Sequence, residues 1–279
     1  MNHHSHHETH MHRDSPADVL DLDAEVHRGY LASLVEWIAD RSAPRVIVDV
    51  GAGTGTGTCV LAERFPEAEL IAVDRSPQML ARVRDIAGQY GFQDRVRTLE
   101  ADLDAGWPDV ESADLVWAAL SLHHVRNPNV FLQQLHDSLK PGALLVVVEM
   151  ESQPRFLPDD IGIGTQGLEA RAHTLAAERG WNNHPDWSDD LERAGFDVEA
   201  VRRTEIDLDG NTTTARTYAR TVLGKLREGL GNSLSADDLD TLDRLCADHG
   251  LDSLSTRTDL RVRGNRTAWA ARKLDRGVK

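Results

Sequence analysis

The sequence predicts an α/β protein built on a doubly wound sheet, and three observations indicate this fold. Short apolar runs alternate with segments of helical spacing between residues 46 and 150, as in consecutive βαβ units. The run ALLVVVEM at 143–150 is almost continuously apolar, which suits a strand in the middle of a parallel sheet. A glycine-rich loop, GAGTGTG at 51–57, follows the first strand. Its backbone can approach a ligand closely.

Each element of the alternating region has its own signal. Residues 21–39 are predicted to be helical, because apolar and aromatic residues recur there at helical spacing. Strands are expected at 46–50, 69–74, 95–99, 114–119 and 143–150, with helices after the glycine loop, at 78–90 and through 130–139. Ser76 is a good N-cap for the helix at 78–90, with Pro77 at the first helical position.

The second half departs from this alternation. Helices are expected at 168–179, 186–194, 213–230 and from about 235, with a strand within 195–206 and an alternating, antiparallel-type strand at 258–273. No repeat or low-complexity linker divides the chain. We therefore expect a disordered His-rich tail at 1–18 and one domain at 19–279. Within it, the ligand-binding core is 46–150, and helical cap elements are 19–43, 151–194 and 211–255.

Composition narrows the class of partner. The 279 residues carry a formal charge of −15 with no basic run, so a nucleic-acid substrate is not expected. Cys59 and Cys246 fit no metal spacing. The tract MNHHSHHETHMHRD could bind a transition metal, but its lack of apolar periodicity favours a tail, and no metal site is predicted. Without an apolar stretch for a membrane or a signal peptide, the expectation is a cytoplasmic protein that acts on a small molecule.

The glycine loop discriminates between two cofactors. Its glycines alternate, at Gly51, Gly53, Gly55 and Gly57. The dinucleotide template G-x-G-x-x-G would then place threonine at its third glycine, which disfavours NAD. The carboxylate of Asp49, two residues before the loop, would also repel a pyrophosphate. It suits a ligand with positive charge, and S-adenosylmethionine (SAM) has a sulfonium, an amino group and no phosphate. The loop therefore favours SAM.

The segment Asp49-Val50-Gly51-Ala52-Gly53-Thr54-Gly55 resembles motif I of the class I SAM-dependent methyltransferases. The turn Leu139-Lys140-Pro141-Gly142 resembles the family's L-K-P-G-G turn, with Ala143 in place of the second glycine. The resemblance implies a mostly parallel seven-stranded sheet with an antiparallel last strand and helical lid insertions. It also implies that SAM is the cofactor and S-adenosylhomocysteine the product.

The same resemblance implies a set of cofactor-binding residues. Asp74, at the end of the second strand, matches the acidic residue that chelates the ribose hydroxyls, and Asp102 matches the residue that reads the adenine amino group. The full set is Asp49, Gly51, Ala52, Gly53, Gly55, Asp74, Arg75, Met79, Asp102, Leu103 and Ala118. Purely structural interpretations stay open, because Asp49 could cap a loop and Asp74 could cap the helix that begins near Ser76.

Catalysis requires fewer residues than binding. Methyl transfer from a sulfonium is an in-line displacement, so the protein mainly aligns the reactants and excludes water. A hydroxyl or carbon-acid acceptor also needs a base. His123 and His124 follow the fourth strand at the carboxyl edge of the sheet, where ligands bind in such folds, and histidine titrates near neutrality. Glu149 is a rival base. Each of the three could instead shape the pocket or be a structural polar residue.

The acceptor pocket is expected to come from outside the shared core. His27 and Tyr30 are expected to fold over the cofactor, and Trp181 and Tyr218 are candidate walls, although core packing is the favoured role for these two. The predicted function is methyl transfer to oxygen, nitrogen or carbon of a small organic acceptor. The alternatives are a SAM-binding protein without catalysis and, less favoured, an NAD-dependent oxidoreductase. The sequence leaves the oligomeric state open, a homodimer included.

Overall fold

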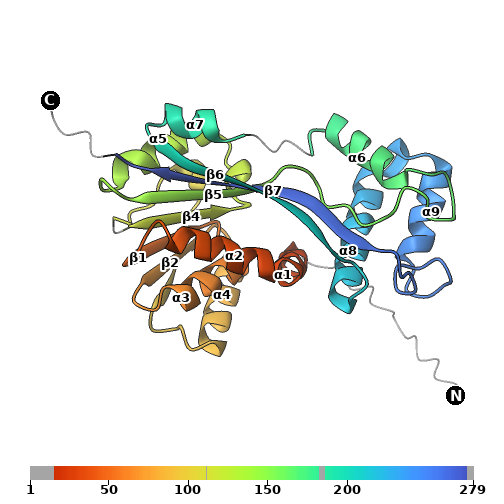
Figure 1. The fold of residues 1–279 in the computed structure, drawn as a ribbon, viewed down its shortest axis with the longest axis horizontal. Coiled ribbons are helices and arrows are strands. Elements are labelled where there is room, and N and C mark those ends of the chain that lie inside the picture. The colour runs from red at the N-terminus through yellow and green to blue at the C-terminus, as the bar shows by residue number, and fades with distance from the viewer. Residues whose placement is uncertain (1–15, 111, 182–185, 275–279) are drawn as a thin grey trace, which may run out of the picture.

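The computed structural model describes residues 16–110, 112–181 and 186–274, and it places them in two lobes (Figure 1). One seven-stranded sheet has the order β3-β2-β1-β4-β5-β7-β6. The strands are β1 (Val46–Val50), β2 (Glu69–Asp74), β3 (Val96–Glu100), β4 (Leu115–Ala119), β5 (Leu144–Met150), β6 (Asp197–Asp209) and β7 (Arg261–Arg272). The first five strands pair in parallel, and β7 runs antiparallel to both β5 and β6. The predicted fold class, including the antiparallel last strand, is confirmed.

Helices cover both faces of the sheet. They are α1 (Pro16–Val26), α2 (Arg28–Ala39), α3 (Thr56–Arg64), α4 (Pro77–Gln89), α5 (Pro128–Ser138), α6 (Leu168–Glu178), α7 (Ser188–Arg193), α8 (Thr213–Leu230) and α9 (Ala236–Cys246). The buried cluster on one face includes α2, α3 and α4, and the cluster on the other face includes α5 and α7. The sheet with these five helices is the first lobe.

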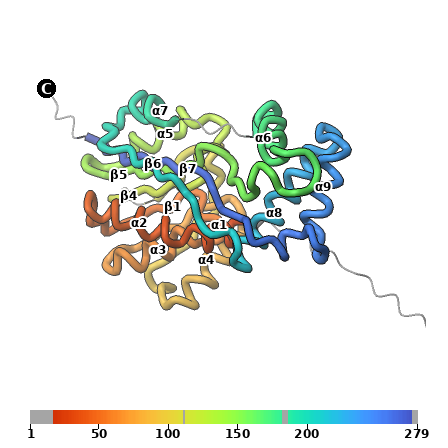
Figure 2. Tube along the Cα trace, turned by 45° about the vertical axis from the view of Figure 1, so that its right-hand side comes forward, coloured from red at the N-terminus to blue at the C-terminus, as the bar shows by residue number. Residues whose placement is uncertain are grey.

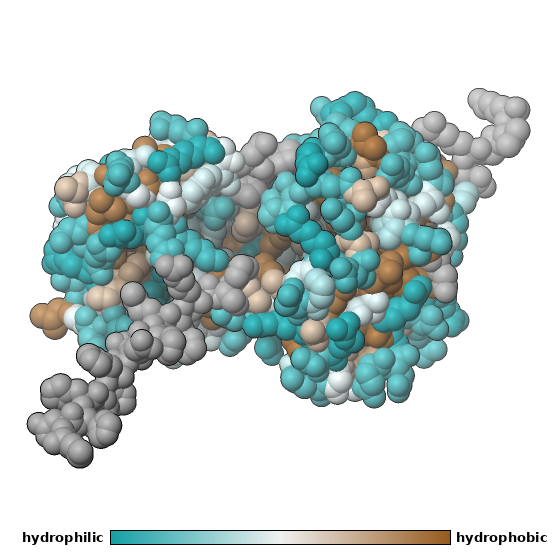
Figure 3. Space-filling view, turned by 180° about the vertical axis from the view of Figure 1, so that it is seen from behind, coloured by the Kyte–Doolittle hydropathy of each residue, from teal (hydrophilic) through white to brown (hydrophobic). Residues whose placement is uncertain are grey.

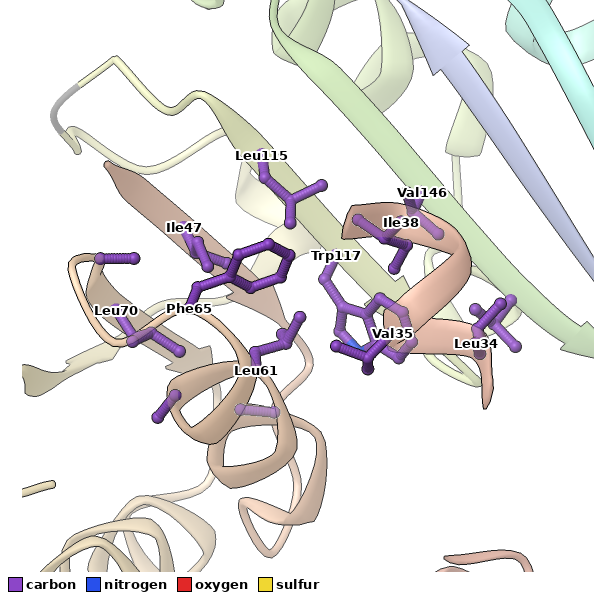
Figure 4. Packing of buried hydrophobic residues seen from close by; sticks show 14 of the residues in the cluster. Leu34, Val35, Ile38, Ile47, Leu61, Phe65, Leu70, Leu115, Trp117 and Val146 are labelled. Carbon is purple, nitrogen blue, oxygen red and sulfur yellow. The ribbon is translucent and has the colours of Figure 1, made fainter. Parts of the chain in front are cut away.

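The core of the first lobe follows from strand alternation. Neighbouring residues of a strand point to opposite faces, so Ile47 and Val48 of β1 belong to different buried clusters. On the first face Trp117 of β4 lies beside Val35 of α2 (Figure 4), and its side chain is 1% exposed. Burial of a side chain of this kind contributes ~1.5–3 kcal/mol or more. The buried side chains on this face, Trp117 among them, therefore support the glycine loop from below.

The second lobe consists of α6, α8 and α9. It has its own buried cluster, built from residues such as Leu223 of α8 and Leu242 of α9. The long strands β6 and β7 extend from the sheet toward this lobe (Figure 1). Helix α1 lies between α8 and the sheet (Figure 2), and the hydroxyl of Tyr218 on α8 donates to Asp23 of α1 over 2.7 Å. The two lobes are therefore joined through the first helix.

Several boundaries differ from the sequence prediction. The expected helix at 21–39 begins at Pro16 and is divided at His27, whose backbone ψ of 16° departs from helical geometry. The hydrogen bonds across the division are kept, because the N–H of His27 donates to Asp23 and the N–H of Leu31 donates to the carbonyl oxygen of His27. Part of the expected tail, 16–18, is therefore helical, and residues 1–15 lie outside the described residues. The predicted N-cap is confirmed, because Ser76 accepts from the N–H of Met79.

Candidate functional site

The glycine loop between β1 and α3 is shaped by three left-handed glycines. Gly51, Gly53 and Gly55 have φ of 69°, 53° and 92°, values that side chains disfavour. The loop folds back over the sheet, since the N–H groups of Gly51 and Ala52 both donate to the carbonyl oxygen of Val73 in β2. The exposed side of the loop is thereby turned toward the carboxyl ends of β2 and β4.

Close packing explains why the glycines alternate. A Cβ atom on Gly51 would lie 2.5 Å from the Cβ of Ser121. On Gly55 it would lie 3.0 Å from the Cα of Val83 in α4. Gly57, already inside α3, would meet the indole nitrogen of Trp117 at 3.0 Å. Each glycine therefore lets a different neighbour approach the loop, and the spacing is a packing requirement of the loop as well as a ligand cradle.

A cavity of ≈420 Å³ opens over this loop, within the range of small-molecule sites. Viewed from behind, the surface is hollowed between the two lobes, with hydrophobic residues inside the hollow (Figure 3). Nine of the residues predicted from the sequence line the cavity: Gly51, Ala52, Gly53, Asp74, Arg75, Met79, Asp102, Leu103 and His124. The structure thus brings most of the predicted cofactor set to one place.

Two carboxylates in the cavity are held by backbone N–H groups. Asp74 accepts from Gly53 over 3.0 Å and from Ser76 over 2.8 Å, one bond to each oxygen. Asp102 accepts from the N–H of Asp104 over 3.0 Å and caps a short 3₁₀ helix. A carboxylate has about four acceptor positions. Both groups are therefore oriented by the chain and still have lone pairs available for hydroxyl or amino groups of a ligand.

Asp49 lies beneath the glycine loop and does not line the cavity. Its side chain is 3% exposed and accepts a 2.5 Å hydrogen bond from the hydroxyl of Thr58 in α3. Burial raises the pKa of Asp49 to about 7, and the nearby Asp74 carboxylate acts in the same direction. The predicted direct contact with a cationic ligand is therefore not visible in this arrangement. Any electrostatic action of Asp49 on the cavity passes through the loop.

Ala118, predicted to bind the cofactor, does not line the cavity, and its neighbour Ala119 does. Ala118 packs in the buried cluster on the far face of the sheet, whereas Ala119 lines the cavity, because neighbouring side chains of a strand alternate. Leu120 follows with a φ of 53°, the single left-handed non-glycine among the described residues, and it also lines the cavity. Such strain is typical of functional sites.

His124 faces the cavity with a second histidine behind it. The ring centroids of His123 and His124 are 4.0 Å apart. The Nδ1 of His123 lies 2.8 Å from an oxygen of Glu149, which is 1% exposed. Burial, followed by the neighbouring His123, lowers the pKa of His124 below its usual value of 6.5. Neutral His124 can therefore accept a proton, whereas His123 and Glu149 stand outside the cavity lining and support it.

A buried ionic group closes the other end of the cavity. Arg266 of β7 is 4% exposed, and its Nη2 donates to Asp23 of α1 over 2.6 Å. Burial would raise the pKa of Asp23, but Arg266, His27 and the hydroxyl of Tyr218 together hold that pKa well below its usual range. Asp23 therefore stays ionised. Asp23 and Arg266 line the cavity, whereas His27 and Tyr218 support Asp23 from behind.

Two further predicted acceptor residues lie away from the cavity lining. Tyr30 is buried under the guanidinium of Arg266, 5.6 Å from its ring centroid, and burial raises the pKa of Tyr30 to about 12. Trp181 packs against Gly229 at the end of α8, in the second lobe. Of the expected cap elements, 151–194 and 211–255 contribute no described side chain to the cavity lining, whereas 19–43 contributes residues of α1 and α2.

Sequence reasoning missed several lining residues. They are Leu20, Asp23, Ala24, Leu31, Thr54, Thr56, Gly57, Ala101, Asp104, Trp117, Ala119, Leu120, Ser121, Val125, Val148 and Arg266. Most are neighbours in sequence of predicted residues. Asp23 and Arg266 had no local signal, because Arg266 follows the mostly polar run RVRGN at 261–265 and its sequence context does not indicate a buried residue.

Two classes of site are not found in the described part of the chain. No group of three or more histidine, cysteine, aspartate or glutamate side chains there is arranged to hold a metal ion. None of the helices at 16–110, 112–181 and 186–274 is long and apolar enough to cross a membrane.

Comparisons with known proteins agree on one type of domain. Residues 48–145 match the family described as Methyltransferase domain. The trans-aconitate 2-methyltransferase of Acidovorax sp. strain JS42 is 30% identical over 190 residues, 68% of this chain and 66% of the relative. The malonyl-[acyl-carrier protein] O-methyltransferase of Laribacter hongkongensis is 31% identical over 177 residues, 58% of this chain and 55% of the relative. The chain thus spans just under two thirds and just over half the length of these two curated relatives.

Among solved structures, a candidate methyltransferase from Bacillus halodurans shares the fold. Its TM-score is 0.55 at 19% identity, and the match covers 87% of this chain and 98% of that one. At this identity the likeness concerns the fold alone. It includes most of the second half of this chain, where the Methyltransferase domain match ends at residue 145.

Proposed function

The chain belongs to the class I SAM-dependent methyltransferases, and from this premise we propose that it transfers a methyl group from SAM to a small organic acceptor bound in the cavity over its glycine loop. The observation that carries the proposal is the position of neutral His124 in the same cavity as Asp74, Asp102 and the glycine loop. A donor-binding edge and a proton acceptor thus share one cavity.

The residues present fit the donor that the family uses. Gly53 has a left-handed backbone, and a Cβ atom added to it would contact only the Cδ1 of Leu20, at 3.3 Å. The space beside this glycine is therefore open to a ligand. Asp74 and Asp102 offer oriented carboxylate oxygens for the ribose hydroxyls and the adenine amino group, and the Met79 side chain supplies an apolar wall. When bound, SAM supplies a methyl group that its sulfonium already activates. The chain supplies position, a dry environment and a base.

We assign the base role to His124. With its pKa lowered by burial and by His123, the imidazole is neutral at pH 7 and can take a proton from an acceptor hydroxyl or carbon acid. The hydrogen bond from the Nδ1–H of His123 to Glu149 fixes the orientation of the ring that packs on His124. Glu149 and His123 therefore position the base and do not themselves touch the acceptor.

The test measures S-adenosylhomocysteine release from a panel of acceptors that includes phenols, amines, carbon acids and carboxylic acids. The two relatives named above act on trans-aconitate and on a malonyl group, both of which carry carboxylates, so acids belong in the panel. Release with at least one small acceptor supports the proposal. SAM binding without release from any acceptor would instead support a binding protein without catalysis.

The base assignment has its own experiment. For an acceptor that must lose a proton, the acidic limb of the kcat profile is expected below pH 6.5, because neutral His124 is the active form. His124→Gln should remove this limb and lower kcat by about 10²–10⁴-fold. His136→Gln is the matched control, since His136 lies on α5 and packs against Phe196 away from the cavity. An unchanged acidic limb in His124→Gln would refute the assignment.

A further inference from the structure

We propose that the acceptor carries a carboxylate and that Arg266 binds it. The inference rests on the proposed methyl transfer and narrows its substrate to an acidic small molecule. It starts from the ionic group at the end of the cavity formed by α1, α2 and β7, where the sequence pattern indicated His27 and Tyr30 but not Arg266.

The guanidinium of Arg266 is buried, charged and only partly used by the protein. Its Nη2 contacts Asp23 at 2.6 Å and Nδ1 of His27 at 3.3 Å. Its Nε and Nη1 make no hydrogen bond to another described residue, and neither is among the fully enclosed polar atoms without a partner. Because Arg266 lines the cavity, we infer that these two donors are accessible from it.

A buried guanidinium with spare donors selects an anion. Arginine has five N–H donors and no acceptor, and its bonds to carboxylates are roughly twice as strong as neutral hydrogen bonds. Asp23 neutralises the charge and orients the group, but it occupies only the Nη2 side. An amide or hydroxyl would satisfy the donors less well than a carboxylate.

The distribution of charge places this anion away from the nucleoside-binding edge. Asp74, Asp102 and Asp104 line the cavity together with Arg75, which is adjacent to Asp74 in sequence. A carboxylate would be repelled there. Arg266 is contributed by β7, where Ala268, two residues further on, pairs with Val148 of β5, and Val148 and Ala119 also line the cavity. The apolar body of the acceptor can therefore rest on β4 and β5 while its carboxylate reaches Arg266.

SAM also has a carboxylate, at its amino-acid end, so the same chemistry has a second source. We assign Arg266 to the acceptor because, under the proposed function, the glycine loop and Asp74 bind the donor. Arg75 also lines the cavity and its charge acts on His124, but it follows Asp74 directly in the chain, at the nucleoside-binding edge. The alternative is that Arg266 binds the donor. It predicts that removal of the guanidinium weakens SAM itself.

The experiment measures binding, which needs no turnover. Calorimetry compares benzoate with benzamide and glutarate with glutaramide, on protein saturated with S-adenosylhomocysteine. At least one acid is expected to bind more tightly than its amide, and Arg266→Gln should remove roughly 10- to 100-fold of that acid's affinity, the effect of losing charged hydrogen bonds. Arg202→Gln is the matched control, since this arginine contacts Ser33 on the outside of α2. It should leave the preference unchanged.

Arg266→Lys is the second variant if Arg266→Gln unfolds. It keeps the positive charge that pairs with Asp23 but loses the remaining guanidinium donors, so the preference for acids should fall while the protein stays folded. Equal binding of acids and amides in the wild type, or a fall in SAM affinity without a fall in acid affinity in Arg266→Gln, would overturn the inference. If acids bind through Arg266 but no acceptor yields S-adenosylhomocysteine, only the proposed function is contradicted. If neutral acceptors yield S-adenosylhomocysteine and Arg266→Gln does not change that rate, only the inference is contradicted.

Discussion

Substitution of Gly51 by alanine provides a quantitative test of how the glycine loop is built. Gly51 combines a left-handed φ of 69° with a neighbour, the Cβ of Ser121, that an added Cβ would meet at 2.5 Å. Ser121 cannot easily retreat, because its hydroxyl donates to the carbonyl oxygen of Val50 over 2.7 Å in a buried position. Two separate penalties therefore act at one residue.

The size of each penalty can be estimated. A left-handed backbone costs an alanine roughly 1–2 kcal/mol, and forcing an atom into a packed site costs about 1–3 kcal/mol more. The sum, about 2–5 kcal/mol, corresponds to a fall in Tm of roughly 5–15 °C for a protein of this size. Gly91→Ala isolates the first penalty, because Gly91 has a φ of 76° and nothing within 4 Å of the added Cβ.

A double-mutant cycle separates the two penalties. Urea unfolding of Gly51→Ala, Gly91→Ala, Ser121→Gly and the double variant Gly51→Ala/Ser121→Gly gives the coupling between the two sites. Once Ser121 has lost its Cβ, Gly51→Ala should cost no more than Gly91→Ala does. If Gly51→Ala costs the same in both backgrounds, or no more than Gly91→Ala in the wild type, steric contact with Ser121 does not explain the glycine.

Two further predictions concern the carboxylates. Asp74→Ala should weaken SAM binding by roughly 10-fold or more in calorimetry, since it removes the charged acceptor at the ribose position, and retained affinity would contradict the assignment. Asp49→Asn tests the pKa of Asp49, raised by burial from 3.8 to about 7. A raised pKa in the folded state favours folding below about pH 4 and loses that contribution as the pH rises to about 7. Urea unfolding at pH 4–8 should therefore show a smaller loss of stability with pH in Asp49→Asn than in the wild type.

The part of the cavity formed by the glycine loop and Asp74 could be predicted because its sequence signals are local. Ser76 caps α4 through a contact three residues away, and Asp74 binds Ser76 two residues away. The glycines are constrained by their own φ values. In such cases sequence spacing contains the geometry. The prediction for Ala118 differs from the structure by a single residue, because a shift of one residue along a strand places the side chain on the other face of the sheet.

The rest of the cavity could not be predicted because it depends on contacts between distant segments. Asp23 and Arg266 are 243 residues apart, and neither lies in a pattern that spacing can identify. Tyr218 was expected as a wall, yet the second lobe turns its hydroxyl toward Asp23. Trp181 instead packs against Gly229 within that lobe. Residues of this kind are fixed by how the lobes meet, and periodicity does not encode that.

The first helix has two roles that cannot be separated. Its residues Leu20 and Ala24 cover the cavity, and Asp23 is the counter-ion that makes burial of Arg266 tolerable. A buried charge deprived of its partner costs about 3–5 kcal/mol. The position of α1 over the cavity is therefore coupled to the charge of Arg266 at the end of the cavity. An anion bound to the other donors of Arg266 would bring a second negative charge close to Asp23, and so it would act directly on the helix that covers the cavity.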